Sequence, residues 1–254
     1  MVDKKKLETL YKKYNSREHI HPDPLELVYN YTRARDMEIA GLIASSLAYG
    51  RVGQILKYVS YVLGKLGKSP YSYLMAACKS DLEHLFDGFK YRFTDSSQLV
   101  FFLLCTREAL IKYGSLNECF LQGYNHKHKD ILPALLAFIK NLTCKPSNFC
   151  NSLFPAAGGK SALKRFNLYL RWMVRSDNVD PGCWEGIPAS KLIIPLDTHM
   201  HKMALKLGLT SRKQADMGTA LEITEAFRKI EPEDPVKYDF CLTRLGINKL
   251  GYIF

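Results

Sequence analysis

The segment from Ile193 to Leu209 places an aspartate where it could stabilise a positive charge. An apolar run ends at Asp197, and the apolar residues that follow recur at helical spacing as far as Gly208. We therefore predict that Asp197 caps the N-terminus of a helix and that Gly208 ends it. Capping alone is enough to explain an aspartate at this position. A carboxylate there is also held ionised by the helix dipole and the backbone amides, so it can stabilise a cation that forms nearby.

A basic helix is predicted ahead of this segment, over residues 160–175. Lys164, Arg171 and Arg175 share one face of it by their spacing, while its apolar residues fit the opposite face. A stripe of positive charge of this kind can follow a phosphate backbone. The same spacing suits a surface helix whose apolar face packs inward, and the two interpretations are compatible.

The composition favours a polyanionic partner. The 254 residues contain 36 Lys and Arg against 25 Asp and Glu, which gives a formal net charge of +11. Nucleic acid is the leading candidate, and an anionic membrane surface is the weaker one. The chain has no uninterrupted apolar stretch of about 18 residues, and its first residues have no signal-peptide core, so we expect a cytoplasmic protein. Its seven scattered cysteines form no CxxC pair and are expected to be reduced.

The apolar residues recur at steps of three and four along nearly the whole chain, which predicts an all-α protein. Turn-forming prolines and glycines divide it into about ten to twelve helices, and no segment has a convincing strand pattern. No repeat, low-complexity segment or long linker separates the chain into pieces. We therefore predict one all-α domain over residues 1–254, with two helical lobes that change over near residues 144–160.

Three short motifs resemble those of the helix-hairpin-helix DNA glycosylases. Residues 195–199, PLDTH, are similar to the Val-Asp-Thr-His segment of that superfamily, and residues 164–168, KRFNL, are similar to its Lys-Thr-Ala-Asn-Val. Residues 154–159, FPAAGG, stand in the place of its Leu-Pro-Gly-Val-Gly hairpin. The separation of 33 positions between Lys164 and Asp197 is similar to that of the archaeal 8-oxoguanine glycosylases. The whole chain most resembles an uncharacterised bacterial family related to that branch.

The resemblance implies a compact all-α fold with a DNA cleft between two helical lobes. It also implies that Lys164 and Asp197 are the catalytic pair. In the hairpin, Ala156-Ala157 replaces Gly-Val, which puts in question the carbonyl cation site that the superfamily uses to hold a phosphate. The four-cysteine loop of some members is missing, so no iron–sulfur cluster is expected, and no organic cofactor is implied.

The chemistry of base excision explains why a lysine and an aspartate would act together. Cleaving a base from deoxyribose builds positive charge at C1′, which a carboxylate stabilises more in the transition state than in the ground state. An amine then captures C1′, and the Schiff base with the opened sugar permits strand cleavage by β-elimination. A lysine is a nucleophile only where burial or a neighbouring cation lowers its pKa from about 10.4. Lys160 is the rival nucleophile, because GGKSA is similar to the segment that follows the superfamily's hairpin.

The resemblance also implies residues that contact DNA and the excised base. The expected DNA contacts are Lys160, Arg165, Arg175, His199, Tyr49, Arg51 and Gln54, and the residues expected to line the base pocket are Arg171 and Asp239. Two alternatives stay open, since Asp239 could cap its helix or pair with Arg244, and Tyr49 could be plain packing. No metal site is expected, because His199 and His201, two positions apart on a helix, point in different directions.

We therefore predict a base-excision repair enzyme, a DNA glycosylase with AP lyase activity that removes an oxidised purine, with 8-oxoguanine favoured. Its expected partner is double-stranded DNA that contains a damaged base, and not a membrane. A monomer associated with the nucleoid is expected. The alternatives are a glycosylase for another damaged base, a non-catalytic DNA-binding helical module, and a helical scaffold for other proteins.

Overall fold

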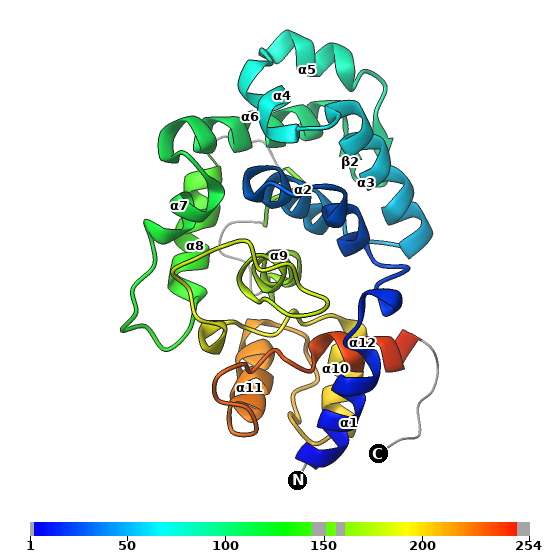
Figure 1. The fold of residues 1–254 in the computed structure, drawn as a ribbon, viewed down its shortest axis with the longest axis vertical. Helices are drawn as coiled ribbons and strands as arrows, with labels where there is room; N and C mark the ends of the chain where they lie inside the picture. The colour runs from blue at the N-terminus through cyan, green and yellow to red at the C-terminus, as the bar shows by residue number, and fades with distance from the viewer. Residues whose placement is uncertain (1–2, 144–150, 156–160, 248–254) are drawn as a thin grey trace. The chain divides into compact units, whose positions relative to one another are not determined.

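The computed structural model describes residues 3–143, 151–155 and 161–247. These residues are mostly helical, which confirms the predicted all-α class (Figure 1). The chain forms two compact units: unit 1 contains residues 1–21, 129–131 and 160–254, and unit 2 contains residues 22–128 and 132–159. Within the described ranges, no helix is long and apolar enough to cross a membrane.

Unit 2 is built around the helix α2. Residues 38–48 are all buried, so this helix has no solvent face after its first turns. It packs against η2, α3, α4 and α7. The elements of the unit are η2 (Pro24–Asn30), α2 (Ala34–Ser46), α3 (Val52–Leu66), α4 (Pro70–Ala76), α5 (Lys79–Leu85), β1 (Lys90–Tyr91), β2 (Thr94–Asp95), α6 (Ser96–Tyr113), α7 (Leu116–Leu121) and α8 (Leu132–Leu142).

Unit 1 is built around the helix α9. Residues 166–173 are all buried, as in α2 of the other unit. The helices α1 and α10 both pack against α12, and Figure 1 shows α1 beside α12. The elements of the unit are α1 (Lys4–Tyr14), η1 (Arg17–His19), α9 (Lys164–Val174), η3 (Ala189–Lys191), α10 (Thr198–Lys206), α11 (Met217–Arg228) and α12 (Asp239–Ile247).

The expectation that the chain has no strand is wrong at one place. The strands β1 and β2 form an antiparallel hairpin in which Lys90 pairs with Asp95 and Tyr91 with Thr94. The turn between them consists of Arg92, in the left-handed region with φ 51°, and Phe93. Two-residue strands are too short to show an alternating pattern, and the turn lacks the Asn-Gly or Asp-Gly signal, so sequence reasoning missed it.

The predicted helix over residues 160–175 begins four residues later than expected, at Lys164. Leu163 has φ 50° and ψ 36°, a left-handed conformation that cannot continue a right-handed helix. Ser161 instead forms a bridge with Asp216, at the N-terminus of α11. Lys160 lies outside the described residues.

Two buried carboxylates of α2 cap other helices of unit 2. Glu38 accepts hydrogen bonds from the backbone N–H groups of Leu116 (3.0 Å) and Asn117 (3.2 Å), the first residues of α7. Asp36 accepts one from the backbone N–H of Tyr71 (3.0 Å), near the start of α4. The first N–H groups of a helix have no partner within the helix, so these side chains satisfy groups that would otherwise be buried unpaired.

Replacing Glu38 with glutamine should therefore destabilise the protein. One of the two backbone N–H groups would then face an amide NH2 and lose its acceptor. The loss of this buried hydrogen bond should lower the free energy of unfolding by about 1–3 kcal/mol. Denaturant unfolding measures this change. The control is Glu83→Gln, at an exposed carboxylate 3.3 Å from Lys79, which should change the stability by less than about 0.5 kcal/mol. Equal stabilities of the two variants would show that Glu38 is not a capping residue.

Candidate functional site

Asp197 is the N-cap of α10, as predicted. Its Oδ1 accepts hydrogen bonds from the backbone N–H groups of His199 and Met200, both at 2.8 Å. The apolar run before it is fixed to α11, because the backbone N–H of Ile194 donates to Oγ1 of Thr224 at 3.0 Å. Residues 192–196 are buried and Asp197 is half-buried. The carboxylate is therefore held at the edge of the apolar core with part of its surface open to solvent.

The other end of α10 also lies where the sequence predicts it. Gly208 has φ 66°, and the backbone N–H of Leu209 donates to the carbonyl of Ala204 at 2.9 Å, which is the glycine-dependent helix end. His201 is buried, and its Nε2 lies 2.8 Å from the carbonyl oxygen of Arg212. A carbonyl only accepts, so Nε2 carries the proton and the ring anchors the loop after α10.

Lys164 is the first residue of α9 and is half-buried. The turn before it is held by Asn167, which is buried and donates from Nδ2 to the carbonyl of Ala162 at 2.9 Å. A left-handed leucine costs about 1–2 kcal/mol, so the structure around Leu163 has to impose this conformation. The backbone strain directly precedes the residue that the sequence analysis singled out as the nucleophile.

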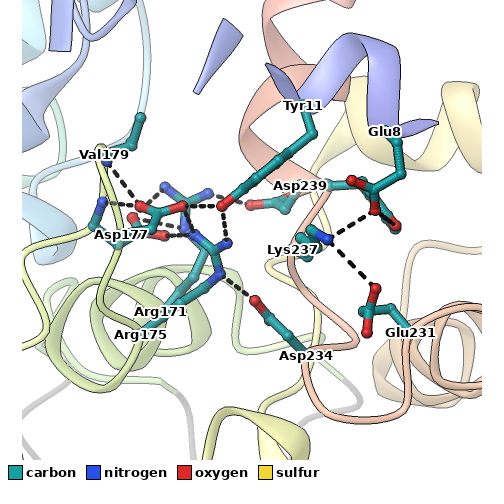
Figure 2. A network of polar contacts seen from close by, with 12 residues as sticks. Glu8, Tyr11, Arg171, Arg175, Asp177, Val179, Glu231, Asp234, Lys237 and Asp239 are labelled. Atoms are coloured by element: carbon teal, nitrogen blue, oxygen red, sulfur yellow. Dashed lines mark hydrogen bonds and ion pairs between the residues drawn. The ribbon is translucent and has the colours of Figure 1, made fainter. Parts of the chain in front are cut away.

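A buried network of charges joins α9 to the start of α12 (Figure 2). Arg171 donates from Nε (3.2 Å) and Nη2 (3.1 Å) to Asp180, and from Nη1 to Asp239. Arg175, one turn later, donates to Asp180 at 2.9 Å and to Asp234 at 2.7 Å. The side chains of both arginines are 5% exposed or less. The network is therefore part of the core of unit 1.

The helix α1 completes this network. The hydroxyl of Tyr11 donates to Asp177 at 2.8 Å and accepts from Nη2 of Arg175 at 3.1 Å. Next to it, Glu8 accepts from Nζ of Lys237 at 2.7 Å, and Figure 2 shows these two groups facing each other. The N-terminal helix is thus tied to α9 and to the segment before α12.

The network holds more acidic groups than basic ones. Two guanidinium groups face four carboxyl groups, those of Asp177, Asp180, Asp234 and Asp239. Burial raises the pKa of Asp239 to about 6, and although Arg171 opposes this, the charges of Asp197 and Asp180 add to it. Burial likewise raises the pKa of Asp180, against the effect of the two arginines. A proton is therefore held in the network at mildly acidic pH.

This electrostatic coupling connects the candidate catalytic residues to the network. Asp197 acts on Asp239, which is bonded to Arg171 of α9. Lys164 lies seven residues before Arg171 on the same helix, about 10 Å along its axis. Lys164, Asp197, Arg171 and Asp239 therefore all belong to the α9, α10 and α12 elements of unit 1.

Arg175 needs a correction. The resemblance implies that it binds DNA, but it is buried, with three carboxylates and Tyr11 as partners, and is therefore not placed to contact a phosphate. The proposed basic stripe is also wrong in part, because Arg171 turns inward with it. The spacing identified the shared face correctly but not its direction, since two of the carboxylates that neutralise it, Asp234 and Asp239, follow their arginines by 59 and 68 positions.

The other predicted residues lie in several places. Arg171 and Asp239 are bonded to each other, whereas Arg244 donates to the carbonyl of Ile20 at 2.7 Å. Their role in a base pocket stays a prediction. The residues Arg51, Gln54 and His199 are exposed, and Arg165 and Tyr49 are half-buried. Lys160 and Ala156-Ala157 lie outside the described residues, so the hairpin stays a prediction as well.

Sequence reasoning missed the carboxylates that surround the two arginines. Asp180 precedes Pro181-Gly182, a pair that indicates only a turn, and nothing near it marks it as the partner of Arg171 and Arg175. Asp234 lies five positions before Asp239, and of the two only Asp239 was expected in the site. The one signal in the sequence is the composition of α9, which has three basic residues, many apolar ones and no acidic residue to neutralise the charge.

A family model whose description is protein of unknown function, DUF2400, matches residues 23–248. The chain belongs to the DUF2400 family. No curated protein and no solved structure matches it. The matched part of this DUF2400 protein contains Lys164, Asp197 and the acidic and basic groups of the network that follow α9, whereas α1 precedes it.

The raised pKa of Asp239 predicts a stability change with pH. The folded protein binds this proton more tightly than an unfolded chain, so the stabilisation is complete below about pH 4 and is lost as the pH rises through about 6. The difference in free energy of unfolding between the wild type and Asp239→Asn should therefore fall by about 2–3 kcal/mol between pH 4 and pH 7. Denaturant unfolding at a series of pH values measures it.

The control is Asp216→Asn, because the pKa of Asp216 is lowered, first by the backbone N–H of Thr219. Its contribution is present above its usual pKa and is lost as the pH falls, so the difference should change in the opposite direction. The same pH trend for both variants would contradict the assignment of the proton to Asp239.

Proposed function

We propose that this DUF2400 protein is a DNA glycosylase with AP lyase activity that removes an oxidised purine, with 8-oxoguanine favoured. A helix-hairpin-helix glycosylase fold and association with the nucleoid are part of this proposal. The observation that carries it is the placement of Lys164 and Asp197. Each stands at the N-terminus of its own helix in unit 1 and is half-buried, so part of its surface is open to solvent.

The proposed reaction begins with the amine of Lys164 in its neutral form. The nitrogen attacks C1′ of the damaged nucleotide, and the bond from C1′ to the base breaks with its electron pair leaving on the base, which takes up a proton. Positive charge develops at C1′ as this bond lengthens, and the carboxylate of Asp197 is the group that would stabilise it. Opening of the sugar ring then gives a Schiff base, which permits β-elimination of the 3′ phosphate before water releases the lysine.

The contacts of Asp197 suit it for this role. Two backbone N–H groups of α10 hold one carboxylate oxygen, Oδ1, so the side chain is fixed before any substrate binds. Fixed charges stabilise a transition state without the cost of reorganising at the moment of reaction. The excess of carboxyl groups in the network behind it also favours a cation over an anion at this place.

The charge of the chain supports a DNA partner. The net charge of +11 is large for its length, and although Arg171 and Arg175 are internally neutralised, exposed basic residues remain on α10. Lys202 and Lys206 are exposed there, as is His199. Several phosphate contacts would make binding fall steeply with salt.

Borohydride trapping tests the proposal on a duplex with 8-oxoguanine opposite cytosine. The wild type should give a covalent adduct, Lys164→Gln should give none, and Asp197→Asn should slow base release about 100-fold or more. Lys79→Gln is the control, since it removes an exposed lysine of α5 that pairs with Glu83 on the same helix, and its adduct should equal that of the wild type. An adduct that survives Lys164→Gln and is lost with Lys160→Gln would move the nucleophile and contradict the assignment.

Three other outcomes would identify the alternatives. Release of a different damaged base in a series of oligonucleotides would keep the mechanism and change the substrate. DNA binding that survives Lys164→Gln and Asp197→Asn, with no base released from any lesion, would identify a non-catalytic DNA-binding module. Weak binding without a steep salt dependence would favour a scaffold for other proteins.

A further inference from the structure

Phe93 is the most exposed large hydrophobic side chain among the described residues, with 70% of its surface in solvent. It lies at the tip of the β1–β2 hairpin, next to Arg92. A single exposed apolar residue is ordinary on a protein surface and needs no explanation by itself. The support beneath Phe93 is what makes this one informative.

A column of aromatic rings lies under Phe93. The ring of Tyr49 is 6.5 Å from that of Phe93, with 27° between the planes. Tyr91 follows at 4.9 Å from Tyr49, and Tyr58 at 4.5 Å from Tyr91, with interplanar angles of 31° and 29°. Four rings therefore stack with similar tilts, and Phe93 forms the end that faces solvent.

Hydrogen bonds make this column rigid. The hydroxyl of Tyr49 donates to the carbonyl of Tyr91 at 3.2 Å, and the hydroxyl of Tyr91 donates to the carbonyl of Tyr49. The Tyr49 hydroxyl is also 2.6 Å from Oγ1 of the buried Thr94. The loop after α2 and the hairpin are thus joined by two hydrogen bonds, one donated from each segment to the other. A ring on such a support loses little conformational entropy when it binds.

Arg92 holds the tip against the α2–α3 loop. Its guanidinium lies 5.5 Å from the centre of the Phe93 ring and packs against Gly50. Gly50 has φ 97°, and a Cβ there would lie 2.7 Å from Nη1 of Arg92. This positive φ favours glycine, so the loop takes this path beside Arg92 without backbone strain. A cation therefore lies beside the exposed ring.

The surroundings of the tip are positively charged. The sequence has no acidic residue between Glu38 and Asp81, a stretch that contains all of α3. Arg51 is exposed at the N-cap of α3, Lys57 lies 5.8 Å from the ring of Tyr58, and Lys90 is exposed on β1. The acidic groups near the hairpin are Asp87, which is exposed, and Asp95, which caps α6.

We propose that Phe93 stacks on an unpaired nucleic-acid base while Arg92 and Arg51 contact the adjoining phosphates. A flat exposed ring at the end of a stacked column, flanked by cations, is complementary to a base with its charged backbone. A membrane surface would need a larger apolar face than one side chain provides. Tyr49, which the resemblance implies as a DNA contact, supports Phe93 in this proposal, because its ring and hydroxyl are engaged inside the column.

This stacking role rests on the DNA partner of the proposed function, but it does not require that the protein excises a base. Affinity for a duplex that contains a tetrahydrofuran abasic-site analogue, measured by fluorescence anisotropy at fixed salt, tests it. Phe93→Ala should weaken binding about tenfold, or about 1.4 kcal/mol, which lies in the range of base–aromatic stacking. Phe93→Trp should bind like the wild type. Arg92→Ala should reduce the slope of log affinity against log salt concentration by about one, as expected for the loss of one phosphate contact.

The matched control is Leu136→Ala, which removes another exposed apolar side chain of unit 2, at 54% exposure, and should change the affinity by less than about twofold. Thermal unfolding of each variant checks the fold. Equal affinities of Phe93→Ala and Leu136→Ala would overturn the inference, as would a wild type that does not bind the duplex. It would also fall if Phe93→Ala reduced binding to anionic vesicles, or self-association, and left DNA binding unchanged.

The two proposals can fail separately. If borohydride traps nothing but Phe93→Ala still weakens binding tenfold, the stacking role stands and the glycosylase proposal falls. If base release depends on Lys164 and Asp197 while Phe93→Ala binds like the wild type, only the stacking role is overturned.

Discussion

The burial of two arginines on α9 is the constraint on which unit 1 depends. A guanidinium group loses its hydration inside a protein at a cost of several kcal/mol, and only well-placed carboxylates offset that cost. Arg171 and Arg175 take theirs from three sources: the loop that contains Asp177 and Asp180, the segment at Asp234, and the start of α12 at Asp239. These parts of the chain have to assemble together, because a missing partner leaves a buried charge uncompensated.

The same constraint sets the electrostatic environment of Asp197. Asp239 is close enough for the two carboxylates to act on each other, and its raised pKa means that it binds a proton before an ordinary carboxyl would as the pH falls. A protonated Asp239 removes a like charge from beside Asp197 and still accepts from Arg171 through its other oxygen. The electrostatic environment of Asp197 and the stability of the core are therefore coupled through one residue.

Features that depend on neighbouring residues could be predicted, and features that depend on distant ones could not. Asp197 and Gly208 bound α10 because capping is decided within a few positions, and the sequence contains those positions. The start of α9 differed, since Ser161, two residues before the left-handed Leu163, forms a bridge with Asp216, 55 positions later. The exposure of Phe93 could not be predicted, because a phenylalanine is expected to be buried and only the geometry of the hairpin places it in solvent.

The position of α1 has a consequence for synthesis on the ribosome. Glu8 bonds to Lys237 and Tyr238, which follow it by 229 and 230 positions. At about 5–20 residues per second, α1 emerges roughly 10–45 s before those partners exist. All of unit 2 is synthesised within that interval. The helix α1 is therefore synthesised well before its partners, and its apolar face, with Leu7 and Leu10, cannot pack in its final place until Lys237 and Tyr238 have been made.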